Sequence, residues 1–508
     1  AIQDVYDDHP DLWMSPVKML VIANRMFEES MQPWIEWKTM KGIYLDVNYT
    51  DEIGTSSADI KQFIKDKYDE GVAAGQAPTF VVIFGDKDQV APSTNSASET
   101  HMVSDLYYGT VDDDYFPDMY YSRMSAETTA QMDAIINKIL VYEQYTMPDP
   151  SYLNNVLLIA GADSYWNPLV AQPTINYATT YYFNEEHGFD NVYAYLNNYT
   201  GCYEHLNTGV GFANYTAHGG DTSWADPSFT VNDVHNLTNT GKYFWAMGNC
   251  CVAGNWGYSS ECFAEAMIRA EEKAAFGYIG SVPNSYWYED YYFGVGATSQ
   301  VNGQMPLYEN TTMGTYDAMW IDGMYNTLSS TAFVGNLAVC YATESGYEIS
   351  VGPLYYWEAY HVFGDGSVMP YRTQPVVNDV SHLPTLPIGV STYSITAAPG
   401  SYVGISKDGI LYGAGMIDET GTTEIPLTPI TSGGDVNIVV THPQYEPYIV
   451  TVPAAALDGP YIVCKGVDLK DENQQADYGE TLSFDMVLEN VGTETANNMT
   501  VTLSTESE

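Results

Sequence analysis

Positively charged residues are scarce in this sequence. Lys and Arg together make up 17 of the 508 residues, against 65 Asp and Glu, so the formal net charge is -48 at pH 7. A surface this negative repels phosphate backbones and anionic lipid headgroups. The composition therefore argues against nucleic-acid binding and against a role at membrane surfaces, and it favours hard cations as ligands.

Long apolar runs are also missing. No run approaches the roughly 18 consecutive apolar residues of a membrane-spanning helix, so we expect no membrane span. The 44 Tyr and 10 Trp residues argue against a disordered chain, because aromatic side chains bury large areas. At 508 residues, the chain has room for about three domains of ordinary size.

Cysteine is sparse as well. The six cysteines are scattered and lack C-x-x-C spacing, which argues against a disulfide scaffold and a zinc site. We expect Cys202, Cys262 and Cys340 to be buried free thiols, since free Cys behaves as a small hydrophobe. The adjacent Cys250 and Cys251 follow an apolar run. Successive strand side chains point to opposite faces, so only one of the two can face a catalytic partner, and alternation does not decide which.

The first two thirds of the chain alternate strands with helices. This alternation predicts parallel sheets covered by helices, in two adjacent α/β subdomains over residues 1–149 and 150–374. The expected strands of the first are residues 17–23, 43–47 and 79–84, and its expected helices are residues 24–41, 57–73 and 126–145. In the second, strands are expected from residue 156 and up to residues near 218, 251 and 280, and helices at 259–273, 316–344 and 355–363.

The pattern changes near residue 375. Short alternating strands punctuated by turns such as Asp408-Gly409 and Gly433-Gly434 predict a β-sandwich over residues 375–455. Residues 456–508 begin another β pattern but are too few for a sandwich of ~100 residues. We interpret them as a truncated β module or a linker.

The chain is organised around residues 211–290. Three short apolar runs there predict buried parallel strands, and each stops at small or polar residues. Ligands bind at the carboxyl ends of strands in open α/β sheets. His218 ends one run and the Cys pair ends the next, so a thiol and an imidazole are expected to meet there. That pairing is typical of a cysteine nucleophile with its acid/base.

Several phrases carry a family resemblance. They are Gly201-Cys-Tyr-Glu-His-Leu-Asn-Thr-Gly209, Asn214-Tyr-Thr-Ala-His-Gly219, Ser285-Tyr-Trp-Tyr-Glu-Asp290 and Tyr356-Trp-Glu-Ala-Tyr-His-Val-Phe-Gly-Asp-Gly366. From about Asp4 to Val452 the sequence resembles the gingipains, which are caspase-like cysteine peptidases, and most closely their Lys-specific members. The resemblance implies two caspase-like α/β/α subdomains followed by an immunoglobulin-like β-sandwich. It also implies a secreted or cell-surface endopeptidase, associated with a bacterial outer membrane, that cleaves proteins or peptides after Lys. We expect it to act as a monomer.

The resemblance also implies catalytic roles. Cys251 would be the nucleophile and Cys250 its buried neighbour. His218 would be the general acid/base, and Asp163 would orient the imidazole and stabilise its charged form. Backbone N–H groups of Gly219 and Cys251 would form the oxyanion hole.

A specificity pocket is implied as well. Asp290 would hold the substrate Lys, with Thr216 and Tyr286 nearby and Trp287 as an apolar wall. The sequence departs from the family at Tyr288, which stands where a glycine is expected on the way to Asp290, and at Gly220-Asp221 after His218-Gly219. Tyr288 bears on the shape of the specificity pocket, so Arg stays open as the accepted residue.

The acidic run at residues 112–118 is a candidate calcium loop. Carboxylates at alternating positions suit the six to eight oxygen ligands of Ca²⁺, and the alternative is a solvated acidic loop. The resemblance implies structural calcium there, and Glu265 matches a residue near a further cation site. The implied ligands are Asp88, Asp112, Asp114, the Phe116 carbonyl and Asp118.

Two alternatives remain open from the sequence. One is the same peptidase chemistry with Arg preference. The other is an inert adhesin or carbohydrate-binding surface protein that keeps a peptidase scaffold. A complete Asp163, His218 and Cys251 set argues against the second.

Overall fold

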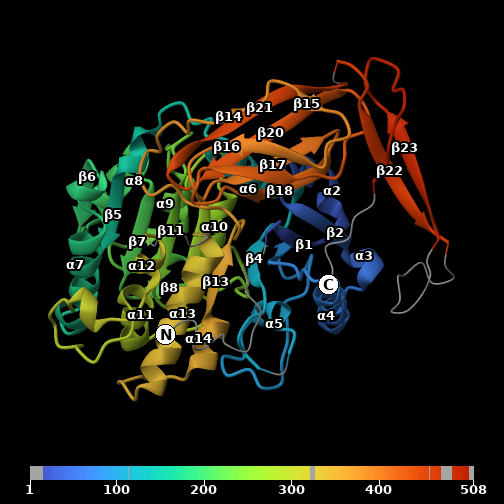
Figure 1. Cartoon of the computed structure of the whole chain (residues 1–508). Coiled ribbons are helices and arrows are strands. Elements are labelled where there is room, and N and C mark those ends of the chain that lie inside the picture. The colour runs from blue at the N-terminus through green and yellow to red at the C-terminus, as the bar shows by residue number, and fades with distance from the viewer. Residues whose placement is uncertain (1–14, 113, 321–325, 457, 471–482, 503–508) are drawn as a thin grey trace. The chain divides into compact units, whose positions relative to one another are not determined.

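The computed structural model describes residues 15–112, 114–320, 326–456, 458–470 and 483–502 (Figure 1). The chain divides into two compact units. The first comprises Ala1–Lys38, Tyr44–Val377 and His442–Pro447, and the second comprises Thr39–Ile43, Asn378–Thr441 and Tyr448–Glu508. Each unit is described by itself below.

A ten-stranded sheet forms the centre of the first unit. Its strand order is β2-β1-β3-β4-β13-β12-β11-β7-β5-β6. Neighbouring strands are parallel throughout, except that β13 runs antiparallel to β12. The strands are β1 (Lys18–Ala23), β2 (Tyr44–Tyr49), β3 (Phe80–Phe84), β4 (Tyr120–Met124), β5 (Asn155–Ile159), β6 (Asn191–Ala194), β7 (Phe212–Thr216), β11 (Phe244–Asn249), β12 (Ala275–Ser281) and β13 (Tyr360–Phe363). The predicted parallel α/β arrangement is confirmed.

The structure corrects the prediction of two separate sheets. Residues 355–363 were expected to be helical throughout, but α14 (Pro353–Ala359) ends at Ala359 and β13 begins at the next residue. The buried sequence Tyr-His-Val-Phe consists of aromatic and β-branched side chains that suit a strand. Because β13 pairs with β12 on one side and with Arg123 of β4 on the other, it joins the two predicted subdomains into one sheet. A subdomain boundary at residue 150 stays a prediction.

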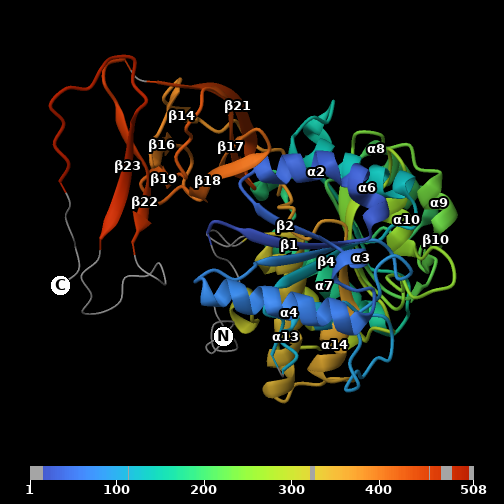
Figure 2. The same cartoon turned by 90° about the vertical axis from the view of Figure 1, so that its right-hand side faces the viewer.

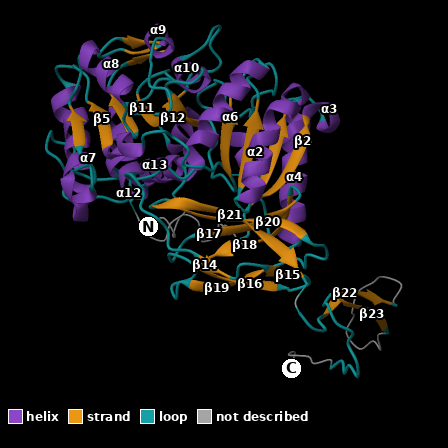
Figure 3. Cartoon of the chain, turned by 90° about the horizontal axis from the view of Figure 1, so that it is seen from above, coloured by secondary structure: helices purple, strands orange, loops and turns teal. Residues whose placement is uncertain are grey.

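Helices cover both faces of this sheet (Figure 3). Figure 2 shows α2 (Glu28–Met40) and α4 (Ser57–Ala73) on opposite sides of β1 and β2. The predicted helix at 57–73 is confirmed, and Ser56 caps it by accepting the Asp59 N–H. The predicted helix at 126–145 is α6 (Thr129–Glu143), capped by Thr128.

Along the chain, further helices connect the strands from β5 to β13. The expected single helix at 316–344 is instead divided into α12 (Thr315–Ala318) and α13 (Leu328–Glu344), because Thr327 starts a new helix by capping the Ser330 N–H. The others are α7 (Gln172–Tyr181), α8 (Tyr199–Thr208), α10 (Phe263–Arg269) and α11 (Trp287–Val295). Among the residues that the structure describes, no helix has both the length and the apolar character needed to cross a bilayer.

Two sheets share one apolar core in the second unit. The three-stranded sheet has the order β14-β16-β19 and the five-stranded sheet the order β15-β21-β20-β17-β18. Side chains from both, including Ile395, Ile425, Ile405 and Ile438, belong to one buried cluster. The strands are β14 (Ser381–His382), β15 (Leu386–Pro387), β16 (Thr392–Thr396), β17 (Tyr402–Lys407), β18 (Ile410–Met416), β19 (Thr422–Pro426), β20 (Gly434–His442) and β21 (Tyr445–Ala455). Beyond them, β22 (Ile462–Leu469) pairs antiparallel with β23 (Phe484–Asn490), inside the stretch predicted to be a β module or linker.

A buried ion cluster ties distant parts of the first unit together. Lys38 of α2 places its Nζ 2.7 Å from Glu143 Oε2 and 2.7 Å from Asp365 Oδ2, and all three side chains are almost inaccessible to solvent. The indole N–H groups of Trp37 and Trp34 donate to the same two carboxylate oxygens. Burial alone would raise the pKa of Asp365, but Lys38 offsets this and holds that pKa below its usual value.

Replacing this lysine tests the cluster. Lys38→Met removes the cation that contacts two buried carboxylates, which should lower the free energy of unfolding by roughly 3–5 kcal/mol in urea titrations. Lys67→Met is the matched control, because Lys67 pairs with Asp46 and Glu70 at the surface and should cost less than about 1 kcal/mol. Equal losses in the two variants would contradict the role given to the buried cluster.

Candidate active site

Three neighbouring parallel strands end at the same edge of the sheet. Ile159 of β5 pairs with Tyr215 of β7, and Thr216 of β7 pairs with Asn249 of β11. The chain after these strands carries Asp163, His218 and Cys251 in turn. Parallel pairing therefore delivers a carboxylate, an imidazole and a thiol to one edge; the strand pattern predicted this for His218 and the Cys pair, and the family resemblance implied it for Asp163.

His218 and Asp163 are in direct contact. His218 Nε2 lies 3.0 Å from Asp163 Oδ2. The other carboxylate oxygen accepts N–H groups from Trp166 at 2.7 Å and Tyr165 at 2.8 Å. The Trp166 N–H, followed by His218, holds the pKa of Asp163 below its usual value. Asp163 therefore stays ionised and orients the imidazole.

The two adjacent cysteines differ in exposure. Cys250 is 1% exposed, whereas Cys251 is partly accessible and its Sγ lies 3.5 Å from the Ser285 carbonyl oxygen. Burial raises the pKa of both thiols. Of the two, Cys251 alone is accessible to a substrate, which answers the question that strand alternation left open.

The backbone after His218 lies against the cysteine pair. A Cβ added to Gly219 would lie 2.3 Å from the Cys251 carbonyl oxygen and 2.8 Å from Cys250 Sγ, so only glycine fits. His218 also meets the edge of the Trp287 ring, with centroids 5.3 Å apart. Among the hydrogen bonds made by the described residues, none joins the His218 ring to Cys251. Such contacts often tighten only when substrate binds.

Asp290 is a buried carboxylate surrounded by hydroxyl groups. It lies in the first turn of α11 and is 4% exposed. Ser285 Oγ donates to its Oδ2 at 2.6 Å, and the hydroxyls of Tyr356 and Tyr360 donate to its Oδ1 at 2.9 and 2.6 Å. Loss of hydration raises the pKa of Asp290 to about 7 despite these donors. No ion pair found among the described residues includes Asp290.

Tyr356 and Tyr360 were missed as site residues. Both stand in a phrase that carried the family resemblance, but only the folded chain brings β13 and the end of α14 next to α11. The Tyr356 hydroxyl also accepts the Tyr286 N–H at 2.9 Å, so it links two predicted pocket residues, Tyr286 and Asp290. The sequence contained one usable signal, a pair of hydroxyls four residues apart.

The remaining predicted pocket residues surround the same edge. Trp287 stacks on Trp166 with centroids 5.7 Å apart and planes 9° apart. Tyr288, the residue that departs from the family, meets the edge of Trp166 at 5.5 Å. Its ring therefore joins this aromatic group beside His218.

Thr216 is the last residue of β7 and pairs with Asn249 of β11. It is 1% exposed, and its Oγ1 accepts an N–H from the Asn214 side chain at 3.0 Å. Neither Asn214 Oδ1 nor either polar atom of the Asn249 amide has a hydrogen-bond partner among the described residues, although both side chains are buried. Unsatisfied buried amides of this kind bind water or a polar ligand group.

The carboxylates of the predicted calcium loop are used within the loop. Asp112 Oδ1 accepts the Asp114 N–H at 3.0 Å, and Asp114 Oδ1 accepts the Phe116 N–H at 2.7 Å. Asp118 Oδ2 accepts the Val111 N–H at 2.7 Å. Within the described ranges, no three His, Cys, Asp or Glu side chains converge as metal ligands would. Each of these three carboxylates accepts a backbone N–H of the loop through one of its oxygens, and calcium binding there stays a prediction.

The other two predicted metal residues lie elsewhere. Asp88 is exposed on the turn after β3. Glu265 is buried, with Arg269 Nη2 at 2.6 Å from its Oε1 and the Ser125 hydroxyl donating to the same oxygen at 2.8 Å. These contacts make Glu265 a partner of an arginine, and its place near a further cation site stays a prediction.

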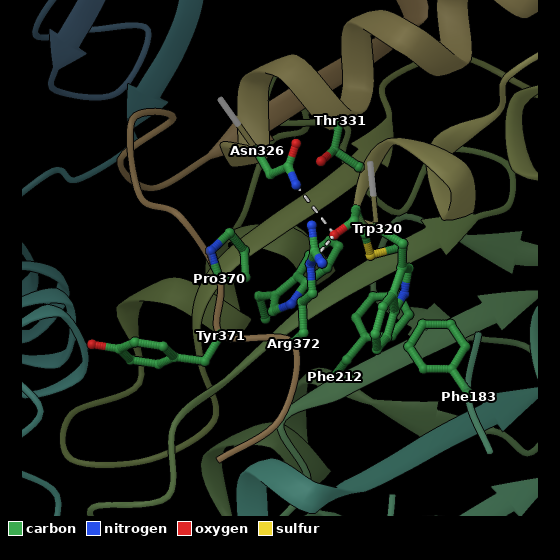
Figure 4. Close-up of a pocket in the computed structure, with 10 residues that line it drawn as sticks. Phe183, Phe212, Trp320, Asn326, Thr331, Pro370, Tyr371 and Arg372 are labelled. Atoms are coloured by element: carbon green, nitrogen blue, oxygen red, sulfur yellow. Dashed lines mark hydrogen bonds between the residues drawn. The ribbon is translucent and has the colours of Figure 1, made fainter. Parts of the chain in front are cut away.

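A separate hollow lies at the amino ends of β7 and β11 (Figure 4). Arg372 lies over the Trp320 ring there and donates its Nε–H to the Met319 carbonyl. The lining residues are Phe183, Phe212, Trp245, Met319, Trp320, Asn326, Thr331, Pro370, Tyr371 and Arg372. None of the candidate catalytic or pocket residues is among them, so this hollow is distinct from the site.

Sequence comparison identifies the family. The profile of peptidase family C25 matches residues 13–371. The chain belongs to peptidase family C25. Lys-gingipain HG66 of Porphyromonas gingivalis is 53% identical to it over 456 residues, which cover 89% of this C25 chain and 26% of that protein. The chain thus spans about a quarter of the length of that curated relative. The resemblance seen in the sequence is confirmed.

Solved structures agree with the fold of this C25 chain. A structure described as that of a protease has a TM-score of 0.86 and 51% sequence identity, covering 89% of this chain and all of that one. The Arg-specific cysteine proteinase gingipain R has a TM-score of 0.71 at 20% identity, covering 86% of this chain and 98% of that one. At 20% identity the second likeness concerns the fold alone.

Selective alkylation tests the difference between the two cysteines. Iodoacetamide should label Cys251 in the native chain, while Cys250 and the buried Cys202, Cys262 and Cys340 should react only through local unfolding. The labelling rate of Cys251 should rise with pH, since burial raises the pKa of its thiol and only the thiolate reacts. Peptide mapping by mass spectrometry measures both, and denatured chain is the control. Equal native labelling of Cys250 and Cys251 would show the exposure difference to be wrong.

Proposed function

We propose that this chain is a cysteine endopeptidase that cleaves protein or peptide substrates after Lys. Cys251 is the nucleophile, His218 the general acid/base and Asp163 its orienting carboxylate. The observation that carries the proposal is the position of Ser285, whose carbonyl oxygen faces Cys251 Sγ and whose hydroxyl binds Asp290. One residue thus connects the reactive thiol to a buried carboxylate that lacks a cation.

The catalytic cycle follows from the charge states. Because burial raises the pKa of Cys251, the thiol is neutral until His218 takes its proton during attack on the scissile carbonyl. The Nε2 side of the ring faces Asp163, which leaves Nδ1 to accept that proton. The ionised Asp163 stabilises the imidazolium, which then protonates the leaving amine. Water hydrolyses the thioester, with the same imidazole acting as base.

The developing oxyanion needs donors close to the thiol. Gly219 is packed against the Cys251 backbone, so the N–H groups of these two residues are the proposed oxyanion hole. Any side chain at Gly219 would collide with that backbone. The requirement for glycine after His218 therefore supports the assignment.

Preference for Lys follows from the chemistry of Asp290. A carboxylate with three hydroxyl donors is buried without an opposite charge, and a substrate ammonium supplies it. Trp287 offers an apolar wall for the aliphatic stem of the lysine. Lys is favoured over Arg because the chain is 53% identical to a relative named Lys-gingipain over 89% of its length.

Cleavage assays test the reaction and the preference together. Matched peptides that differ only in Lys or Arg before the scissile bond should show cleavage after Lys by the native chain. Cys251→Ala should abolish cleavage, and Cys250→Ala should leave most of it. Arg preference would support the alternative within the family. No Cys251-dependent cleavage of either peptide would leave the inert surface protein as the better interpretation.

Changing Asp290 isolates its role. Asp290→Asn keeps the size of the side chain and removes the charge that binds the substrate ammonium, at a cost of roughly 2–5 kcal/mol in transition-state binding. The kcat/KM for Lys peptides should therefore fall about a hundredfold or more. Unchanged Lys preference in this variant would refute the pocket assignment.

The same assay run against pH checks the ionisation of Asp290. The native kcat/KM for Lys should also fall as pH drops through about 7, because Asp290 takes up a proton there while the substrate lysine stays charged. In Asp290→Asn that contribution to the pH profile should disappear.

Three finer features belong to the same proposal. The two sheets of the second unit, which share one core, form an immunoglobulin-like sandwich. The protein is secreted or displayed at a bacterial cell surface, associated with the outer membrane, and acts as a monomer. The acidic loop at 112–118 binds structural calcium, supported by three carboxylates within one short loop.

Chelation tests the calcium loop. If calcium binds only the folded chain, it raises the free energy of unfolding by RT ln(1 + [Ca²⁺]/Kd). Saturating calcium should therefore raise the melting temperature, and a chelator should lower it. The double variant Asp112→Asn, Asp114→Asn should lose this response. Asp418→Asn is the matched control, because Asp418 accepts the Thr420 N–H in a similar acidic turn of the second unit. A melting curve indifferent to chelator would support the solvated acidic loop.

A further inference from the structure

Tyr215 joins the segments that carry the two members of the His218–Asp163 pair. We propose that its hydroxyl is a positioning group that holds His218 and Asp163 in register for catalysis. The inference rests on the proposed function, since it concerns the acid/base pair of that reaction. Tyr215 itself does not contact the reacting atoms.

The contacts of the Tyr215 side chain carry the argument. Tyr215 is the residue before Thr216 at the end of β7 and is 0% exposed. Its hydroxyl donates to the His218 carbonyl oxygen at 2.5 Å and accepts the Asp226 N–H at 3.0 Å. Its ring stacks on Trp224, with centroids 5.1 Å apart and planes 13° apart. A rigidly packed ring therefore fixes one hydroxyl between two segments.

Asp226 extends this connection to the loop that carries Asp163. Its Oδ2 accepts the Ala162 N–H at 3.2 Å, one residue before Asp163. Asp163 in turn contacts His218 Nε2 at 3.0 Å. The hydrogen bonds thus form a closed ring, from the Tyr215 hydroxyl to the His218 backbone, across the imidazole to Asp163, and back through Ala162 and Asp226.

The two loops have little room to move independently. Gly161 has a φ of +66°, and a Cβ there would lie 2.2 Å from the Ala217 Cβ, so the Asp163 loop lies directly against the residue before His218. Asn167 and Asn197 donate to the carbonyl oxygen of Gly161. Those contacts hold the start of the loop. On the side of the chain before Asp163, the Asp226 contact at Ala162 is one residue away, and Asp226 depends on Tyr215 for its backbone position.

The charge state of Tyr215 suits this role. Burial raises the pKa of the phenol well above its usual range, so the hydroxyl keeps its proton. It therefore donates to the His218 carbonyl at every pH at which the imidazole works. A neutral donor also leaves the charge balance of the Asp163–His218 pair unchanged.

Tyr215→Phe removes the hydroxyl and keeps the stacked ring. The expected result is a fall in kcat of about tenfold with KM for Lys peptides unchanged, since a small misplacement of a catalytic group costs rate and not substrate binding. In an Asp163→Asn background the same change should cost nothing further, because the pair it positions is already broken. Asp226→Ala should also lower kcat. Asp226 is partly exposed, so this variant tests the same connection even if Tyr215→Phe fails to fold.

Tyr278→Phe is the matched control. Tyr278 is equally buried, and its hydroxyl accepts the indole N–H of the same Trp224 at 3.1 Å, while no hydrogen bond found among the described residues joins it to either loop. This variant should lose stability but keep kcat. Equal losses of kcat in both tyrosine variants, or an equal loss from Tyr215→Phe in the Asp163→Asn background, would overturn the proposal.

A crystal structure of Tyr215→Phe separates this inference from the proposed function. The His218 Nε2 to Asp163 Oδ2 distance should lengthen beyond hydrogen-bond range, while that of Tyr278→Phe should stay near the native value. An unchanged distance in Tyr215→Phe would overturn the positioning role whatever the activity. If the native chain cleaves no Lys peptide but the distance lengthens, the proposed function fails and the positioning role stands.

Discussion

The pairing of β5, β7 and β11 sets the positions of Asp163, His218 and Cys251. Parallel strands must align their carboxyl ends to share hydrogen bonds, so the turns that follow them meet at one edge. Close approach there excludes side chains at Gly161 and Gly219, which lie against Ala217 and against the backbone of Cys251. The hollow around Trp320 lies at the opposite edge of the sheet, at the amino ends of β7 and β11, and is therefore far from Cys251 and His218.

The scarcity of positive charge shapes how the interior is held together. Arg123 binds both oxygens of Asp105 at 2.7 Å, and Arg269 reaches Glu265 at 2.6 Å, so two of the few cations are fully buried. Lys38 lies between two further carboxylates. Removing one member of such a pair leaves an uncompensated buried charge, which is why these positions constrain the fold. Asp290 is different, because its partners are hydroxyl groups.

Helix caps and hydrophobic periodicity, which act between residues close in sequence, predicted many of the helices and strands. The capped helix α4 and the strands β7, β11 and β12 follow from hydrophobic period and cap residues. The strand β13 could not be predicted in this way. A run of only four residues after a helix fits either helix or strand, and its pairing with β4 and β12 decides for strand. The hydroxyl ring around Asp290 joins residues about seventy positions apart, and no periodicity reports contacts of that range. The unequal exposure of Cys250 and Cys251 likewise depends on packing after the strand has ended.

Tyrosine hydroxyls orient the buried carboxylate of this site, as lysine and arginine orient the buried carboxylates of the core. Burial raises the pKa of Tyr215, Tyr356 and Tyr360, so each phenol keeps its proton and remains a neutral donor. A lysine or arginine placed beside Asp290 would orient the carboxylate equally well, but it would also neutralise it and repel the lysine ammonium of the proposed substrate. Hydroxyl donors hold the carboxylate in place and leave its charge uncompensated. Tyr215 applies the same principle to the catalytic pair, since it fixes the His218 backbone without adding a charge that would compete with Asp163 for the imidazole.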